Sequence, residues 1–396
     1  MKRVMLVFGT RPEAIKLAPV ARELTARADH DPVIVTTAQH REMLDQVLEL
    51  FEISPDIDLN LGRPRQDLAS LTARTLESLS PVIEKEDPDA ILVQGDTMTT
   101  VVGALAGFLA GVPVVHLEAG LRTSDRRNPF PEEMNRRLTT QLSELHLAAT
   151  ATARENLLNE GVPPDRIEVT GNTVIDSLLW AVEQQRPVTD PLLAAAEAHE
   201  GPVVLWTTHR RESWGEPMAR VARAVTNLAW SHPDLLVVLP LHRNPAVREV
   251  LLPEIDGHPN VLVGEPTDYW SFSRLLRRAD ILLTDSGGIQ EEAPSLGKPV
   301  LVTRDSTERV EAIEAGVALL VGTDPLRIMH ALDKLLTNPK AGAEISRRMN
   351  PYGDGKAAER TVAALDRLLG DPVQVPEFAA GARQDIGAEL DVAGST

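Results

Sequence analysis

The sequence of 396 residues contains no cysteine, and this absence excludes three kinds of chemistry. Without cysteine there is no disulfide bond, no thiolate nucleophile and no zinc site built on sulfur ligands.

Positive charge is also in short supply. Lysine and arginine together number 40, against 58 aspartates and glutamates, which gives a formal net charge of −18. Surfaces that bind nucleic acid or anionic membranes need a basic face that replaces counterions. The composition therefore argues against both partners, and any anionic ligand must be held by a local group of residues.

Long hydrophobic runs are missing as well. The longest apolar stretch, residues 101–115, is shorter than the roughly 18 residues that indicate a membrane-spanning helix. The N-terminal MKRVMLVFGT has too short an apolar run for a signal peptide, and it predicts a first β-strand. We therefore expect a cytoplasmic protein with no membrane partner.

The length of the chain and its alternation of strand and helix patterns predict a two-domain α/β protein. The chain is too long for one ordinary core. Short β-branched runs alternate with segments of helical periodicity, which predicts doubly wound parallel sheets. Strands are expected at residues 4–8, 32–37, 90–94, 113–117, 145–149, 167–171, 203–208, 235–241, 261–265, 281–285, 299–303 and 318–322.

The rhythm lapses once, around residues 183–202, which indicates two Rossmann-like halves. We expect domains over residues 1–172 and 202–371, joined by a linker region over residues 173–201. NPYGDG reads as a turn before a final helix near 357–369, a helix that can pack back on the first domain. Residues 372–396 lose periodicity and predict a flexible tail.

Ligands of open parallel sheets bind at the carboxyl ends of the strands, so the residues there are the site candidates. FGTRPEAIK ends the first strand and places Arg11 and Lys16 near a helix N-terminus that faces the expected cleft. The alternative is that both are ordinary solvated side chains. The motif matches neither the dinucleotide fingerprint nor the Walker loop, so it predicts neither site.

Carboxylates follow the next strands along. Asp96 in QGDT and Glu118 in HLEAGLRT end adjacent predicted strands, where acids and bases of α/β enzymes lie. Glu132 begins the helix after NPFP, and it either joins them or only interacts with the helix dipole. His209 in TTHRRESW ends a strand of the second half and is expected to face them, although a lone histidine is more often structural. We assign no metal.

The segment TDSGGIQEEA predicts an anion site. The backbone N–H groups of Ser286, Gly287 and Gly288 can form a cradle for phosphate without a lysine. Glu292, one turn later, is placed to accept hydrogen bonds from vicinal hydroxyls such as those of ribose. Arg309 in TERVEA is expected to supply positive charge. Together these features favour a nucleoside diphosphate as ligand.

The motifs FGTRPEAIK, TAQHREMLDQ, QGDT, HLEAGLRT, PEEMNR, GNTVID, HRRES, DSGGIQEEAPSLGKPV and NPYGDG, taken in order, resemble the non-hydrolysing bacterial UDP-N-acetylglucosamine 2-epimerases. The resemblance implies a GT-B fold, with two Rossmann-like domains whose parallel sheets face a central cleft. It implies interconversion of UDP-N-acetylglucosamine and UDP-N-acetylmannosamine, with UDP as a further ligand. We expect no cofactor, since the dinucleotide fingerprint is missing. The resemblance carries over the site residues named above and adds Phe272 beside the uracil.

The same resemblance implies further properties. Some members are activated by substrate bound beside the active site, and the matching positions are Gln39, His40, Arg65, Arg210 and His242. A homodimer is implied, as is the supply of N-acetylmannosamine units for cell-surface polysaccharide.

The reaction itself favours an elimination. C1 of a UDP-hexosamine is locked as an acetal, so no carbonyl makes the C2 proton acidic. An enzyme can oxidise a neighbouring carbon with NAD or expel UDP to give a glycal, and the missing dinucleotide fingerprint favours expulsion. The rival hypotheses are a GT-B glycosyltransferase, a hydrolysing epimerase, and a nucleotide-sugar-binding regulator without catalysis.

Overall fold

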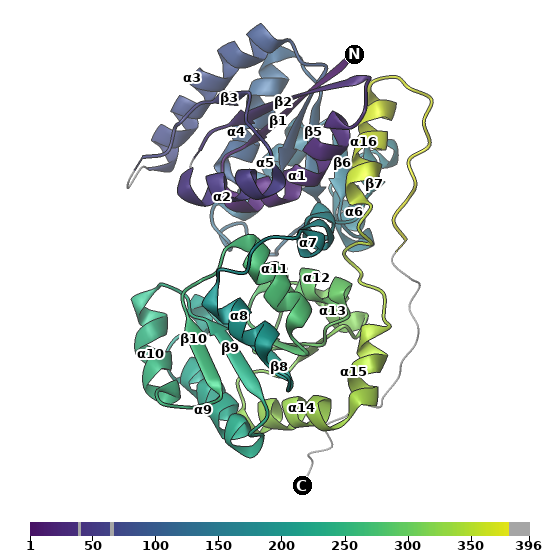
Figure 1. Cartoon of the computed structure of the whole chain (residues 1–396). Helices are drawn as coiled ribbons and strands as arrows, with labels where there is room; N and C mark the ends of the chain where they lie inside the picture. Colours follow the sequence, from purple (N-terminus) through teal and green to yellow (C-terminus); the bar gives the residue numbers. More distant parts are fainter. Residues whose placement is uncertain (39–40, 64–66, 380–396) are drawn as a thin grey trace.

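The computed structural model describes residues 1–38, 41–63 and 67–379, and it contains two parallel sheets, each covered by helices (Figure 1). The first domain runs β1 Lys2–Phe8, α1 Arg11–Thr25, β2 His30–Thr36, α2 Arg41–Phe51, β3 Ile57–Asp58, α3 Leu68–Glu86, β4 Ala90–Gln94, α4 Met98–Ala110, β5 Val114–Ala119, α5 Glu132–Leu142, β6 Leu145–Ala148, α6 Ala151–Asn159 and β7 Ile167–Val169. Its strand order is β3-β2-β1-β4-β5-β6-β7.

Helix α7 Thr173–Glu183 leads into the second domain. This domain runs α8 Pro191–Ala198, β8 Val203–Thr207, α9 Glu216–Ser231, β9 Leu236–Pro240, α10 Pro245–Ile255, β10 Val261–Gly264, α11 Tyr269–Arg278, β11 Ile281–Thr284, α12 Gly287–Glu292, β12 Val300–Val302, α13 Val310–Glu314, β13 Ala318–Leu320, α14 Pro325–Thr337 and α15 Pro339–Ser346. Its strand order is β10-β9-β8-β11-β12-β13. Two doubly wound domains of this kind form the GT-B fold that was expected.

In each sheet the order of strand addition reverses beside the first strand, between β1 and β4 and between β8 and β11. Ligands of doubly wound folds bind at such switch points. All strand pairs are parallel, and the central strands are buried on both faces, which explains their continuous apolar sequence. The two switch points hold the loops that carry Arg11, Asp96, His209 and Asp285.

All twelve predicted strands are present, with ends that differ by a few residues, and the structure adds two elements. The short β3 pairs with the end of β2. Helix α8 lies inside the stretch where the rhythm was expected to lapse. Its N-cap is Asp190, whose side chain accepts a hydrogen bond from the N–H of Leu193 at 2.9 Å. The predicted linker region is therefore largely helical, since it also contains α7.

The last helix, α16 Ala357–Leu368, packs on α1 of the first domain and on α7 (Figure 1). Asp366 of this helix contacts Lys2 of β1, and the Asp176 carboxylate of α7 accepts from the N–H of Ala358 at 2.8 Å. The predicted tail begins as ordered chain, because Phe378 is buried and its N–H donates to the carbonyl of Val169 at 2.9 Å. The rest of that prediction lies outside the described residues.

Within the described parts of the chain, no helix has both the length and the apolar character needed to cross a membrane.

Candidate active site

Glu118 is the polar centre of the first domain's switch-point edge. Its backbone has φ of 62°, and the pairing of β5 with β6 is irregular at this point, so the strand turns the side chain out of the sheet. The Lys16 ammonium and the Gln94 amide both contact its Oε2 atom. Asn172 approaches Oε1 at 3.5 Å. The side chain is only 13% exposed, so the Lys16 partner offsets much of the cost of burying its charge.

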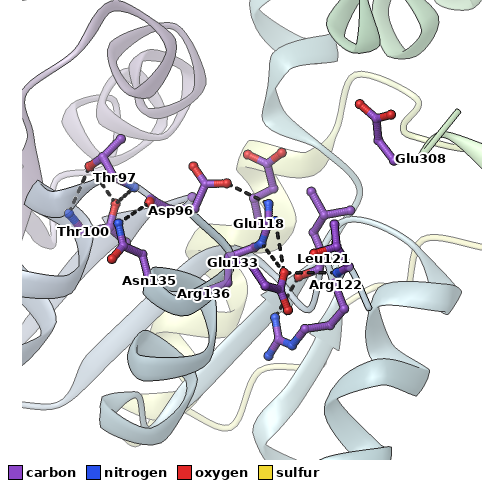
Figure 2. Close-up of polar contacts among 12 residues, drawn as sticks. Asp96, Thr97, Thr100, Glu118, Leu121, Arg122, Glu133, Asn135, Arg136 and Glu308 are labelled. Atoms are coloured by element: carbon purple, nitrogen blue, oxygen red, sulfur yellow. Dashed lines mark hydrogen bonds and ion pairs between the residues drawn. The ribbon is translucent and has the colours of Figure 1, made fainter. Parts of the chain in front are cut away.

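Asp96 lies in the neighbouring loop, after β4 (Figure 2). Its Oδ2 atom accepts from Arg136 at 2.8 Å, and Asn135 donates to its backbone carbonyl at 2.8 Å. Burial raises the pKa of Asp96, and the charge of Glu118 adds to this effect, whereas Arg136 and Lys16 oppose it. A carboxyl with a raised pKa keeps its proton to a higher pH than an ordinary aspartate does, which suits a group that transfers protons.

The two acids at the start of α5 have different surroundings. Glu133 is fully buried, pairs with Arg136 and Arg137, and accepts from the N–H of Thr123 at 3.0 Å, so it holds the preceding loop in place (Figure 2). Glu132 has a buried Oε2 atom with no hydrogen-bond partner among the residues described. Glu132 is also the first residue of α5, so the helix-dipole alternative applies there too, and its part in the reaction stays a prediction.

Arg11 and Glu292 come from different domains. Burial lowers the pKa of Arg11, with Tyr269, Asp268 and Glu292 acting against the shift. Burial also raises the pKa of Glu292 to about 8, and the charge of Glu291 adds to the rise. Its Oε2 atom is buried without a partner within the described chain. At neutral pH this side chain is therefore mainly protonated and can donate as well as accept a hydrogen bond.

His209 is fixed by Asp285, at the second domain's switch point. The fully buried Asp285 carboxylate accepts from the His209 N–H at 2.9 Å, and its other oxygen lies 3.2 Å from the imidazole Nδ1. The His209 ring stacks on His242 with centroids 5.8 Å apart. A carboxylate on Nδ1 orients an imidazole and leaves Nε2 for a ligand.

The predicted anion cradle has unusual neighbours. Ser286 precedes α12, and Gly287 and Gly288 begin it. A Cβ added to Gly287 would lie 3.3 Å from a Glu308 carboxylate oxygen and 3.5 Å from the Arg309 guanidinium carbon. Arg309 is therefore beside the cradle, as expected.

Arg309 is already paired in the protein alone. Its Nε donates to Glu291 at 2.5 Å, and Asn172 donates to the same carboxylate at 3.1 Å. The contact joins the two domains, because Asn172 also approaches Glu118 of the first sheet. Glu291 lies close to the predicted phosphate cradle, but its charge is compensated by Arg309, so it repels a phosphate less than a free carboxylate would.

A pocket lies between the domains at this point. It is lined by Glu118 and Asn172 from the first domain's side and by Glu291, Glu308 and Arg309 from the second. Of the predicted residues, Glu118 and Arg309 line this pocket. Lys16 and Asp96 lie beside Glu118, Gly287 lies beside Arg309, and Glu292 lies beside Gly288.

Other predicted residues are more scattered. Phe272 on α11 packs against the main hydrophobic core. Arg210 contacts Glu308 and, through its N–H, Asp285. Three predicted positions of a second ligand site, Gln39, His40 and Arg65, lie outside the described residues.

Sequence reasoning missed Glu13, which is 1% exposed. Its carboxylate accepts from the N–H groups of Gly9 and Thr10 at 3.0 and 2.8 Å and from the hydroxyl of Thr97 at 2.6 Å. It therefore joins the loop that carries Arg11 to the loop that carries Asp96. The available signal was the acid at the third position of a helix, which commonly caps the preceding backbone.

The chain resembles known proteins over most of its length. The family model for UDP-N-acetylglucosamine 2-epimerase matches residues 22–366. A UDP-N-acetylglucosamine 2-epimerase of Yersinia pestis is 50% identical over 370 residues, which cover 92% of this chain and 98% of that protein.

Two solved structures are similar in fold and sequence. A UDP-GlcNAc 2-epimerase from Neisseria meningitidis bound to UDP-GlcNAc has 45% identity and a TM-score of 0.82, and the match covers 92% of this chain and all of that one. The S. aureus MnaA–UDP co-structure has 43% identity and a TM-score of 0.84, with 96% of this chain and all of that one covered.

Proposed function

Because the chain belongs to the family of non-hydrolysing UDP-N-acetylglucosamine 2-epimerases, we propose that it interconverts UDP-N-acetylglucosamine and UDP-N-acetylmannosamine. The observation that carries this proposal is the pairing of two chemistries across one interdomain pocket. Glu118, with Lys16 and Asp96 beside it, lies on one side. Arg309, the arginine proposed to bind the diphosphate, lies on the other.

The proposed reaction is an elimination followed by a re-addition. A base removes the C2 proton while the bond between C1 and the diphosphate oxygen breaks, giving 2-acetamidoglucal and UDP. A proton then returns to the opposite face of C2 as the diphosphate oxygen re-attacks C1. The proton transfers are assigned to the group formed by Asp96, Glu118, Glu132 and His209.

The second domain is proposed to hold the leaving group. The backbone N–H groups of residues 286–288 and the Arg309 guanidinium bind the diphosphate, whose charge grows as the C1–O bond breaks. Glu292, with its raised pKa, exchanges hydrogen bonds with the ribose hydroxyls. Arg11 reaches this site from the first domain, so UDP binding would draw the two domains together.

The test is the reaction in deuterium oxide, with UDP-N-acetylglucosamine as the sole substrate and without NAD or metal. The product is expected to carry deuterium at C2, with a small leak of 2-acetamidoglucal and UDP. Retention of the original hydrogen at C2 would contradict the elimination. Release of free N-acetylmannosamine would indicate a hydrolysing epimerase, and no turnover without an acceptor would indicate a glycosyltransferase.

Further features follow from the family resemblance alone. They are a homodimer, a role in cell-surface polysaccharide synthesis, and activation by substrate at a second site that includes Arg210 and His242. The cytoplasmic location stays a proposal from the short apolar runs of the sequence. Light scattering measures the dimer, and a sigmoidal dependence of rate on UDP-N-acetylglucosamine measures the activation. Hyperbolic kinetics over the full concentration range would count against the second site.

A further inference from the structure

Glu308 is surrounded by arginines. Its carboxylate lies 2.5 Å from Arg210 and 2.7 Å from Arg304, and Arg309 approaches at 3.7 Å. The three cations come from the β8–α9 loop and from the segment between β12 and α13, so only the fold brings them together. Without an anion between them, these three arginines would repel one another at a partly buried position, which would cost free energy.

The position of this carboxylate overlaps the proposed diphosphate site. A Cβ on Gly287 would be 3.3 Å from Glu308 Oε1 and 3.4 Å from Arg210 Nη2. The carboxylate thus lies against the glycine that is proposed to contact the diphosphate, at the edge of the interdomain pocket that it helps to line. Figure 2 shows Glu308 on the second domain, apart from the carboxylates of the first.

Glu308 is an anion at any physiological pH. Burial alone would raise its pKa, but its own backbone N–H, Arg304 and Arg210 lower the pKa to about 2. Its side chain is 28% exposed to solvent, which leaves room for it to rotate away from the arginines.

We propose that Glu308 is an internal counter-anion that the diphosphate of the substrate must displace, and that the arginines it releases then bind the diphosphate. This inference rests on the proposed function, since it requires UDP to bind at residues 286–288. In the free protein the carboxylate neutralises the arginines, and in the complex the diphosphate does so.

The three arginines differ in whether they have a second carboxylate partner besides Glu308. Arg309 keeps Glu291 at 2.5 Å, and Arg304 keeps Glu212 at 2.8 Å. Among the described residues, Glu308 is the carboxylate that the Arg210 side chain contacts in an ion pair. Arg210 is therefore the cation that gains most from an incoming diphosphate.

A competing internal anion weakens binding. The apparent affinity of a ligand is its intrinsic affinity multiplied by the fraction of molecules in which the site is free. For an enzyme whose mechanism releases and recaptures UDP within one turnover, moderate affinity keeps UDP from trapping the site. Glu308 would thus set the UDP affinity without touching the sugar.

The experiment measures binding of UDP, inorganic pyrophosphate and uridine by calorimetry to the wild type, Glu308→Gln and Glu308→Ala. Both variants are expected to bind UDP and pyrophosphate about tenfold more tightly, and uridine with unchanged affinity, because only the anion competes with the carboxylate. The matched control is Glu212→Gln, which removes one charge from the same network at Arg304 but leaves the cradle untouched.

Unchanged or weaker UDP and pyrophosphate binding in the folded variants would overturn the proposal, and so would an equal gain for uridine or an equal gain in Glu212→Gln. If only one of the two Glu308 variants folds, that variant decides. Failure of the wild-type protein to bind UDP at all would instead overturn the proposed function.

Discussion

The Lys16 ammonium and the Glu118 carboxylate are in contact, although 102 residues separate them in the sequence. Lys16 comes from α1, after the first strand of the sheet, and Glu118 from the end of β5, two strands away. Neither side chain is more than 19% exposed. The pair places a carboxylate beside the half-buried Asp96 and shows how the switch point concentrates ionisable groups.

Replacing either carboxylate should slow epimerisation. Glu118→Gln and Asp96→Asn are each expected to lower kcat by at least about 10²-fold, the loss typical of a missing acid or base. Turnover is measured by chromatographic separation of the two UDP-sugars, and circular dichroism checks the fold. Glu155→Gln, at an exposed position of α6, is the control and should keep normal turnover. Near-normal rates in both carboxylate variants would mean that the proton transfers are misassigned.

Glu13 should matter for stability through its backbone contacts. Glu13→Ala leaves the buried N–H of Gly9 and the partly buried N–H of Thr10 without their acceptor, so the free energy of unfolding should fall by about 1–3 kcal/mol. Glu13→Gln should lose much less, because the amide oxygen can still accept from both N–H groups. Urea unfolding of the two variants at similar m-values measures the difference. Equal losses would show that these two bonds are not the source of the effect.

The fold was predictable from the sequence because buried parallel strands are continuous β-branched runs between helical segments. The exceptions have physical causes. The two residues of β3, Ile57 and Asp58, are too few to show a pattern and become a strand only by pairing with Val35 and Thr36. Helix α8 has a capping signal at Asp190, but its short alanine-rich sequence lacks a clear apolar face.

The candidate site was predictable where a residue ends a strand, as Asp96 and Glu118 do, since strand ends converge by topology. Partners drawn from distant segments were not. From the sequence Asn172 is an ordinary helix cap, and its side-chain oxygen does accept from the N–H of Val174. Its amide nitrogen also donates to Glu291, 119 residues further along the chain, which no local pattern indicates. Glu308 reads as a surface acid, and its three arginines come together only in the folded chain.

Glu292 should make the free protein less stable at alkaline pH. Its pKa is raised from the ordinary 4.5 to about 8, so the native state holds this proton more tightly than the unfolded chain. The stability from this group is complete below pH 4.5 and is lost as the pH rises through about 8. Glu292→Gln stays neutral and should therefore lose less stability than the wild type between about pH 6 and about pH 9.

Denaturant unfolding at both pH values, without UDP, measures this difference. The charged groups that face Glu292 are Glu291, Lys16 and Arg11, and all three are unchanged in the variant. Parallel pH profiles of the wild type and Glu292→Gln would contradict the raised pKa.

The Asp176 carboxylate should stabilise the crossing of α16 onto the first domain. It accepts from the N–H groups of Ala357 and Ala358 at 3.2 and 2.8 Å, in the first turn of α16. Asp176→Ala should lower the free energy of unfolding by about 0.5–2 kcal/mol, as loss of a helix cap does, and Asp176→Asn should retain part of it. Thermal unfolding of the three proteins tests this, and a wild-type melting temperature for Asp176→Ala would contradict it.

Arg309 should contribute to UDP affinity although it is paired in the free protein. The guanidinium lies beside Gly287, and its Nε bond to Glu291 leaves its other nitrogens for the diphosphate. Arg309→Ala should weaken UDP binding by about 1.5–3 kcal/mol, the worth of a hydrogen bond to a charged group. Arg309→Lys should recover only part of this loss, because a lysine ammonium lacks the planar set of donors with which a guanidinium can bind Glu291 and a phosphate at once. Calorimetry with UDP measures both. Arg220→Ala, which removes an arginine that donates to Thr323 and has no proposed part in binding the diphosphate, is the control. Unchanged UDP affinity in Arg309→Ala would move the diphosphate away from α12, whereas equal losses in Arg309→Ala and Arg220→Ala would point to net charge and not to a contact.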